Sequence, residues 1–333
     1  MPIQSLLAAI SLLFIANTAC AESRAFITNQ LDNSVSVINT KTQQVIETIK
    51  VEGKPAGVAV NKSLKQVYIS TPEAGGFAVL DSDKLKNLRK VKVGGASLGI
   101  TVDQKGELIF VADWYENSVT VFDARSFEQL KVITVGKSPS GMTVSPDNRW
   151  LYVANRIDDS ISQIDLKKLT IRNTTKVGAH PFGIAIDNQG KRLYTANVES
   201  NDVSVLDSQT LKRLATIKVG ARPYAVALAL NDSRLLVTNQ DDSTVSVIDT
   251  ASLKELEAIT VGDKPEGIST DSDDNQVYVA NWFDNNVSVI DTKNLKVVNT
   301  IKTGEGSRAF GGFIVEWAVR LVAASYSAHY FIS

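Results

Sequence analysis

Hydrophobic and polar positions alternate in short runs along most of the chain, and these runs recur at a constant interval of 42 residues. Each 42-residue unit holds four runs, rich in valine, isoleucine and tyrosine and bounded by glycine, proline, asparagine or aspartate. Such runs are typical of β-strands. No unit contains a useful stretch with the apolar period of a helix, which excludes a solenoid of helix pairs.

The clearest motif is an apolar run that ends in asparagine, such as Leu151–Asn155 (LYVAN). Its seven copies begin, without any insertion, at residues 25, 67, 109, 151, 193, 235 and 277. A second motif begins at Ser36 and recurs in register up to Ser288. A period of 40–45 residues with four strands per unit is typical of a β-propeller. We therefore expect an all-β, seven-bladed β-propeller with four antiparallel strands per blade.

Composition predicts where each strand lies within a blade. The run Gly57–Val60 and its copies mix small and branched residues, as expected beside a narrow central channel. The run that ends at Lys50 is longer and charged, as expected at an outer edge, where charge discourages edge-to-edge pairing. An aspartate follows the third run in six copies, at residues 81, 123, 165, 207, 249 and 291. We expect it to accept backbone N–H groups in a turn rather than to act in catalysis.

The register also predicts how the ring closes. The N-terminal unit lacks an innermost strand, and residues 307–315 occupy that position in the seventh unit. We expect this segment to complete the N-terminal blade, so that residues 22–315 form a ring without an open edge at the seam. Residues 316–333 match no repeat. They are open to interpretation as an added edge strand, a partner-binding segment or a reading-frame accident.

The first 21 residues have the pattern of a signal peptide. An apolar run from Ile3 to Ala16 precedes Ala19-Cys20-Ala21, a small-x-small site whose cleavage would leave Glu22 as the first residue. No lysine or arginine precedes the run, and lipidation of Cys20 is an alternative. The run is too short to span a bilayer comfortably. We expect a protein of the periplasm, the cell surface or the medium, and cleavage would remove the only cysteine, excluding cysteine catalysis.

Composition narrows the chemistry further. The 35 basic and 36 acidic residues give a net charge of −1, so no strong overall field attracts nucleic acid or anionic membrane. With only His180 and His329, a zinc or haem site with several histidines cannot be assembled. The run Asp271–Asn275 opens like a calcium loop, but Gln276 stands where glycine is needed, so an acidic hairpin turn is favoured. We expect no metal, cofactor or catalytic residue.

Several short sequence motifs resemble those of YVTN-family β-propeller repeat proteins, which are exported members of the YVTN/lactonase-like superfamily. They are Tyr152–Asn155 (YVAN), Tyr278–Asn281 (YVAN), Val287–Asp291 (VSVID) and the Gly-x-x-Pro-x-Gly turn. The resemblance covers residues 25–315 and implies the propeller fold. For function it allows surface-layer proteins, periplasmic binding proteins, lactonases and haem-bearing reductase domains.

Candidate site residues follow from the fold. Propeller sites commonly lie at the channel mouth, in the loops that precede the innermost strands and follow the second strands. Residues that differ between otherwise similar copies are the better candidates there. They are Trp114, Tyr115, Arg156, His180, Phe182, Arg222, Tyr224, Lys264, Trp282, Phe283 and Arg308. The alternative is that the aromatic residues only seal blade contacts and that the cations are solvated.

Three functions remain open. The leading hypothesis is a monomeric, non-enzymatic binding or scaffold propeller, without a transmembrane span, whose rim recognises a protein, a peptide or a small ligand. A lactonase-like hydrolase is the alternative, and Glu266, His180 and Arg222 are its only candidates. A third is single-strand nucleic-acid binding, in which Trp114 and Trp282 stack on bases and Arg156, Arg222 and Lys264 meet phosphates. The near-neutral net charge disfavours this third function.

Overall fold

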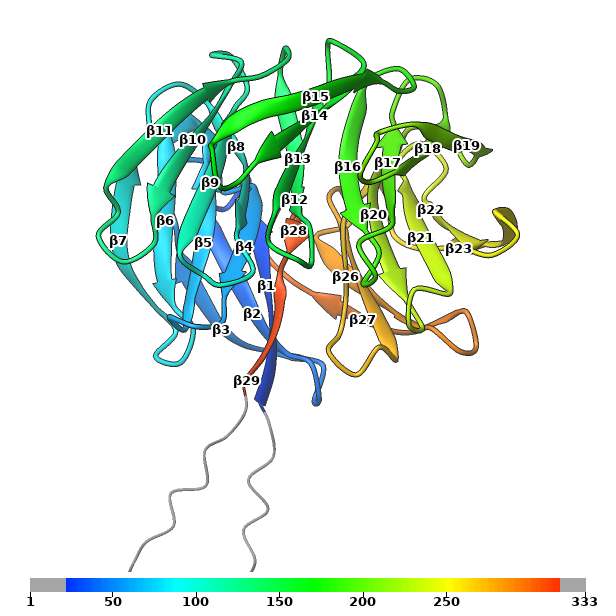
Figure 1. Cartoon of the computed structure of the whole chain (residues 1–333). Coiled ribbons are helices and arrows are strands. Elements are labelled where there is room, and N and C mark those ends of the chain that lie inside the picture. Colours follow the sequence, from blue (N-terminus) through cyan, green and yellow to red (C-terminus); the bar gives the residue numbers. More distant parts are fainter. Residues whose placement is uncertain (1–21, 318–333) are drawn as a thin grey trace, which may run out of the picture.

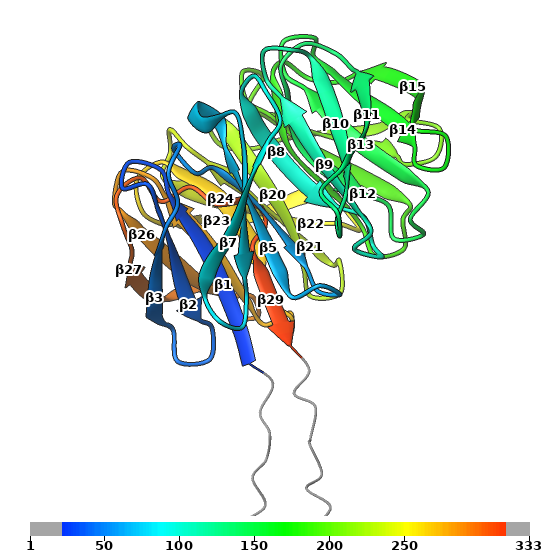
Figure 2. The same cartoon turned by 90° about the vertical axis from the view of Figure 1, so that its left-hand side faces the viewer.

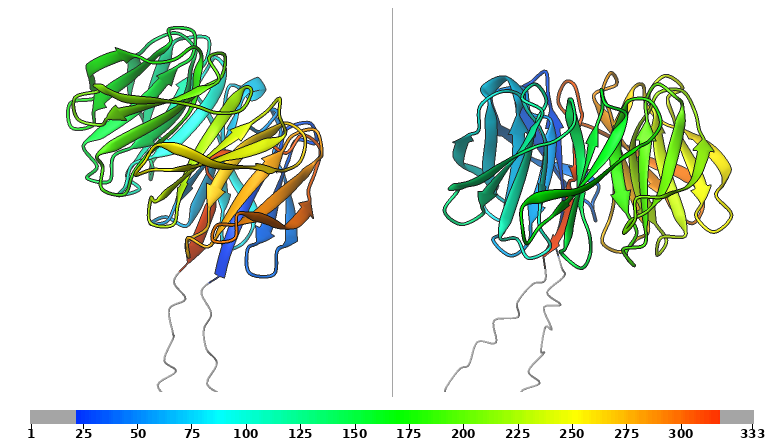
Figure 3. Two further views of the ribbon diagram at one scale, coloured as in Figure 1. Left: turned by 90° about the vertical axis from the view of Figure 1, so that its right-hand side faces the viewer. Right: turned by 45° about the horizontal axis from the view of Figure 1, so that its top comes forward.

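The computed structural model describes residues 22–317, and these form seven sheets around a central axis (Figures 1 and 3). Six sheets have four strands and one has five. The prediction of an all-β, seven-bladed propeller is confirmed. The predicted signal peptide and residues 318–333 lie outside the described residues.

The inner half of each blade consists of an innermost and a second strand. The innermost strands are β4 (Gly57–Asn61), β8 (Ser97–Val102), β12 (Pro139–Val144), β16 (Pro181–Ile186), β20 (Pro223–Ala229), β24 (Pro265–Thr270) and the closing strand β29 (Ile314–Trp317). The second strands are β5 (Gln66–Thr71), β9 (Leu108–Asp113), β13 (Trp150–Asn155), β17 (Arg192–Asn197), β21 (Arg234–Asn239), β25 (Gln276–Asn281) and β1 (Glu22–Asn29).

The outer half follows the same order. The third strands are β6 (Gly76–Asp81), β10 (Ser118–Asp123), β14 (Ser160–Asp165), β18 (Asp202–Asp207), β22 (Thr244–Asp249), β26 (Asn286–Asp291) and β2 (Ser34–Asn39). The outer strands are β7 (Lys86–Lys92), β11 (Gln129–Thr134), β15 (Thr170–Lys176), β19 (Arg213–Lys218), β23 (Lys254–Thr260), β27 (Lys296–Lys302) and β3 (Gln44–Lys50). A short 3-10 helix, η1 (Pro72–Ala74), follows β5.

The innermost strands carry glycine because neighbouring blades leave no room for a side chain. A methyl group added at Gly183 on β16 would lie 2.6 Å from the Tyr224 carbonyl oxygen of the next blade. Glycines at the same register position in β4, β8, β12 and β24 also face the next blade's backbone. The crowding expected from composition is therefore present at the channel.

The core lies between the blades rather than within them. Tyr152 and Tyr278, on second strands, are fully buried, and their hydroxyl groups donate to backbone carbonyls of the following blade. The asparagine that ends the repeat motif is structural: Asn155 donates its amide to Ser160 and Ser162. The predicted aspartate turns are also present, as where Asp165 accepts two backbone N–H groups.

The ring closes as predicted, with β29 pairing antiparallel to β1, and the two strands lie side by side (Figure 2). The register differs from the other blades, however. Val144 pairs with Leu151 in the fourth blade, and the repeat would place residue 312 opposite Ala25. Ile314 stands there instead, so the closing segment contains two extra residues. The strand reaches Trp317, two residues past the predicted propeller boundary.

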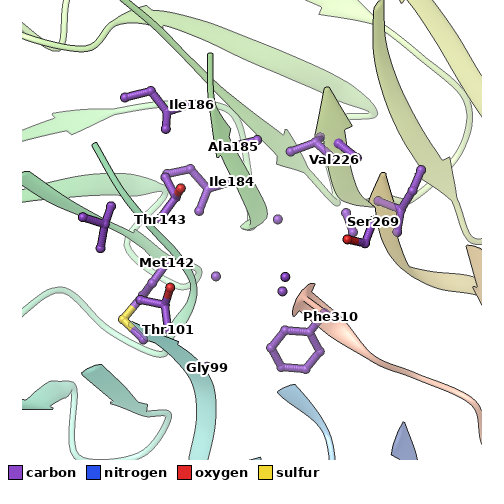
Figure 4. Close-up of a pocket in the computed structure, with 18 of the residues that line it drawn as sticks. Gly99, Thr101, Met142, Thr143, Ile184, Ala185, Ile186, Val226, Ser269 and Phe310 are labelled. Carbon is purple, nitrogen blue, oxygen red and sulfur yellow. The ribbon is translucent and has the colours of Figure 1, made fainter. Parts of the chain in front are cut away.

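The segment that contains the extra residues forms a separate short strand inside the ring. This strand, β28 (Phe310–Gly312), pairs in parallel with β4 and gives that blade its fifth strand. Gly311 has a φ of 101°, a conformation that suits glycine. The detour places the Phe310 side chain at the channel, as seen in Figure 4.

Candidate functional site

The loops expected to form the rim do meet at one end of the ring. In each case the loop after a second strand donates a backbone N–H to the loop before an innermost strand. The Trp114 N–H donates to Ala96, the Arg156 N–H to Ser138 and the Trp282 N–H to Lys264, at 3.0, 3.1 and 2.9 Å. These bonds hold the loops that follow the second strands against the loops that precede the innermost strands.

A pocket of about 250 Å³ lies at this mouth. Six of the eleven candidate residues line it: Trp114, Tyr115, Arg156, Phe182, Tyr224 and Arg308. Pro72, Ala96 and Leu98 complete the lining. We call this cavity the mouth pocket.

Two of its aromatic residues form a packed floor. Phe182 and Tyr224 are buried and stacked, with ring centroids 4.0 Å apart, and Phe310 meets Phe182 edge to face at 5.3 Å. These rings therefore also seal blade contacts, as the alternative interpretation expected. Tyr115, by contrast, is 73% exposed at the pocket's edge.

A largely buried ion pair adjoins the floor, since its arginine, Arg308, also lines the pocket. The Arg308 Nε atom lies 2.8 Å from the Glu266 Oε2 atom, and Arg308 also donates to the Tyr224 hydroxyl at 2.6 Å. The Gln240 amide donates to the other Glu266 oxygen at 3.0 Å. Burial raises the pKa of Glu266 above its ordinary value, against the opposing effects of Arg308 and Gln240. Burial likewise raises the pKa of Tyr224.

Arg156 is the cation of the mouth pocket that no carboxylate neutralises. Its guanidinium lies 5.6 Å from the ring centroid of Trp114. Among residues 22–317, no carboxylate oxygen lies within ion-pair distance of it, and its buried Nε atom has no hydrogen-bond partner. The pocket therefore has an excess positive charge of one, since Glu266 balances Arg308.

The other candidate cations lie in a separate chain of alternating charges. Glu199 contacts both His180 and Arg222, at 3.8 and 2.9 Å, and Asp241 contacts both Arg222 and Lys264. Our sequence reasoning did not select Glu199 or Asp241. They occupy one register position, 42 residues apart, and that repeat is the signal that could have found them.

Trp282 and Phe283 pack on each other with ring centroids 4.7 Å apart, and neither lines the mouth pocket. Phe283 occupies the same register position as Tyr115, four repeats later, and is 55% exposed. The structure therefore divides the predicted rim into a pocket-forming part and a part away from the pocket.

A larger chamber of about 490 Å³ lies in the channel (Figure 4). Phe182 lines both cavities, so it stands between them. The chamber is lined by innermost strands, β28 and two loop residues, Gln104 and Asn188, and none of its lining residues has an ionisable side chain. The lining thus supplies no acid or base.

The described residues hold neither a cluster of metal-ligating side chains nor a membrane-spanning helix. Within residues 22–317, no three His, Cys, Asp or Glu side chains are grouped to hold a metal ion. The Asp271 carboxylate accepts the N–H groups of Asn275 and Gln276, as expected of the hairpin turn. No helix in this range is long and apolar enough to cross a membrane.

Comparison with known proteins gives one family match. Residues 124–210 match the family model described as "Lactonase, 7-bladed beta-propeller". No curated protein matches the chain.

Solved structures with the same fold include hydrazine synthase of Kuenenia stuttgartiensis, at 20% identity and a TM-score of 0.74, covering 80% of this chain and 92% of that one. A functionally unknown protein from Desulfotomaculum acetoxidans is 13% identical, with a TM-score of 0.76 and coverage of 88% and 98%. A Lactobacillus plantarum protein is 18% identical, with a TM-score of 0.77 and coverage of 90% and 100%. At these identities the likeness concerns the fold alone. Together with the seven-sheet topology it shows a seven-bladed β-propeller built from sequence repeats, of which residues 124–210 match the lactonase family model.

Proposed function

We propose that this protein is a non-enzymatic binding propeller, which holds a ligand or the end group of a partner at the channel mouth. The mouth pocket carries the proposal, because it combines aromatic walls with a cation that has no carboxylate partner within residues 22–317. Pockets that bind small ligands are commonly apolar clefts with a few polar groups that fix orientation. The exposed ring of Tyr115 extends this apolar surface outward.

A lactonase-like hydrolase is the second candidate, favoured by the family match over residues 124–210. Such an enzyme needs a group that activates water or an electrophile. Glu266 pairs with the pocket residue Arg308, but Arg308 and Gln240 occupy its two oxygens. His180 lies in the chain of alternating charges with Glu199. The hydrolase therefore rests on the family match rather than on an arrangement of side chains.

We further propose that the protein is an exported member of the YVTN-type propellers. The apolar run before the small-x-small site Ala19-Cys20-Ala21 supports export, with cleavage that would expose Glu22. N-terminal sequencing of protein from a secreting host tests this proposal. Glu22 as the first residue supports it, whereas retained Met1 or lipid on Cys20 contradicts it.

The binding function is tested by ligand-observed NMR with a mixed library of small acids, amines, neutral aromatics and sugars. Tyr115→Ala removes the exposed ring of the pocket, and Phe283→Ala removes the equivalent ring away from it. We expect ligands that bind the wild type to bind the Tyr115→Ala variant more weakly and to bind the Phe283→Ala variant as before. Equal loss in both variants, or no binding by any compound, contradicts the proposal.

The hydrolase is tested separately by following acid release from γ- and δ-lactones in a pH-stat. We expect no turnover above the spontaneous rate. Turnover that Glu266→Gln abolishes, in a variant that melts cooperatively, would establish the hydrolase instead.

A further inference from the structure

The charges around the mouth pocket define the ligand's charge, if the proposed function holds. Arg308 is balanced by Glu266, whereas Arg156 has no carboxylate within ion-pair distance among the described residues. A partly buried cation is stabilised by an opposite charge at close range. A ligand with one negative charge would therefore balance the pocket, and a cationic ligand would add repulsion.

The shape of Arg156 narrows the anion. A guanidinium offers a planar fork of N–H donors that matches the two oxygens of a carboxylate. The Arg156 Nε atom is buried without a hydrogen-bond partner, so a donor of that fork is unused. Since Arg156 also lines the pocket, its guanidinium is placed to donate to a carboxylate bound there.

The remaining walls describe the body of the ligand. Trp114, Tyr115 and Phe182 present aromatic surface, and Pro72 and Leu98 add apolar atoms. Aromatic rings pack favourably in stacked or edge-to-face arrangements. The volume of about 250 Å³ admits a single ring with a short spacer.

We infer that the mouth pocket binds a carboxylate joined by a short spacer to an aromatic ring, with the carboxylate at Arg156. This chemistry occurs both in free aromatic acids and in the last residue of a polypeptide that ends in an aromatic amino acid. The two sources share the recognition group and differ in what lies beyond it.

Isothermal titration calorimetry tests the inference with 3-phenylpropionate and its neutral amide. The peptide source is tested with N-acetyl-Gly-Phe as the free acid and as the amide. We expect each acid to bind at least tenfold more tightly than its amide. Whichever of the two acids binds more tightly identifies the source, a free aromatic acid or a polypeptide terminus.

Two variants make the test specific. Arg156→Gln removes the unbalanced cation, and Arg222→Gln removes a rim cation that carboxylates already balance. We expect Arg156→Gln to abolish the preference for acids, Arg222→Gln to keep it, and Arg156→Lys to keep part of it. Melting curves confirm that each variant folds.

The inference is contradicted if the amides bind as tightly as the acids, or if the Arg156→Gln variant keeps the preference for acids. It is also contradicted if neither acid binds at concentrations on the order of 10 millimolar. These outcomes are distinct from failure of the binding function. Neutral or cationic compounds found by the NMR library, and lost with Tyr115→Ala, would leave the binding function standing and overturn the anionic ligand.

Discussion

Arg308 and Glu266 form an ion pair across the seam of the ring. Glu266 belongs to β24 of the last blade, and Arg308 belongs to the segment that leads to the first blade. Arg308 also donates to Gln30, in the loop after β1. The segment that closes the ring therefore supplies a wall of the mouth pocket, and closure and site are structurally coupled.

Removing Arg308 should make stability depend on pH. In Arg308→Gln the Glu266 carboxylate stays buried without its cation, and breaking such a pair commonly costs about 3 kcal/mol or more. Burial already raises the pKa of Glu266, and loss of Arg308 raises it further. An acid whose folded-state pKa is raised loses stability as pH rises through that pKa. We expect urea unfolding to show a larger deficit relative to wild type at pH 8 than at pH 4.5.

The double variant Arg308→Gln with Glu266→Gln is the control for this prediction. It has no buried carboxylate at this position, so its deficit should be similar at both pH values. An Arg308→Gln deficit that is constant with pH, or larger in acid, contradicts the account of the pair.

Two C-terminal truncations should distinguish the contribution of the closing segment to stability from that of the residues beyond it. Deleting residues 307–333 removes the buried apolar side chains of Ala309, Phe310, Phe313 and Val315. Their burial contributes about 5 kcal/mol or more, so the melting temperature should fall by roughly 10 °C or more. Deleting only residues 318–333 should leave it within about 2 °C of the wild type. Calorimetry measures both, and equal losses would contradict this closure.

Packing residues and pocket residues should respond differently to truncation of the side chain. Tyr278→Ala creates a cavity between the last and first blades and removes the bond to Thr40, so it should cost about 3 kcal/mol or more. Trp114 is only half-buried, so Trp114→Ala should cost clearly less stability while weakening ligand binding. Denaturant unfolding compares the two. Equal destabilisation would mean that Trp114 is a packing residue.

The repeat allowed the fold to be predicted in detail, because one 42-residue register fixes strand order in every blade. It could not predict the seam, because the register assumes identical copies and the closing segment carries two extra residues. The segment with these residues forms β28 and brings Phe310 to the channel. A local departure from the repeat, visible as Gly311-Gly312, is the sequence feature that accompanies it.

The sequence predicted the position of the candidate site, but not which of its cations is neutralised by a carboxylate. Register placed Arg156 and Arg222 on the same rim, and nothing local distinguished them. Their difference comes from partners in other loops, since Glu199 and Asp241 balance Arg222 and no described carboxylate balances Arg156. Contacts between blades decide which cation is free to meet a ligand, and such contacts require the assembled ring.

The most direct test of the mouth pocket is ¹⁹F NMR of protein labelled with 5-fluorotryptophan. The chain has four tryptophans, and single replacements by phenylalanine assign their signals. Trp114 lines the mouth pocket, whereas Trp150 and Trp282 do not. On titration with 3-phenylpropionate, the account predicts a saturable shift of the Trp114 signal while those of Trp150 and Trp282 stay in place, and its amide should give that shift only at roughly tenfold higher concentration or above. A static Trp114 signal, or saturable shifts confined to Trp150 or Trp282, would contradict it.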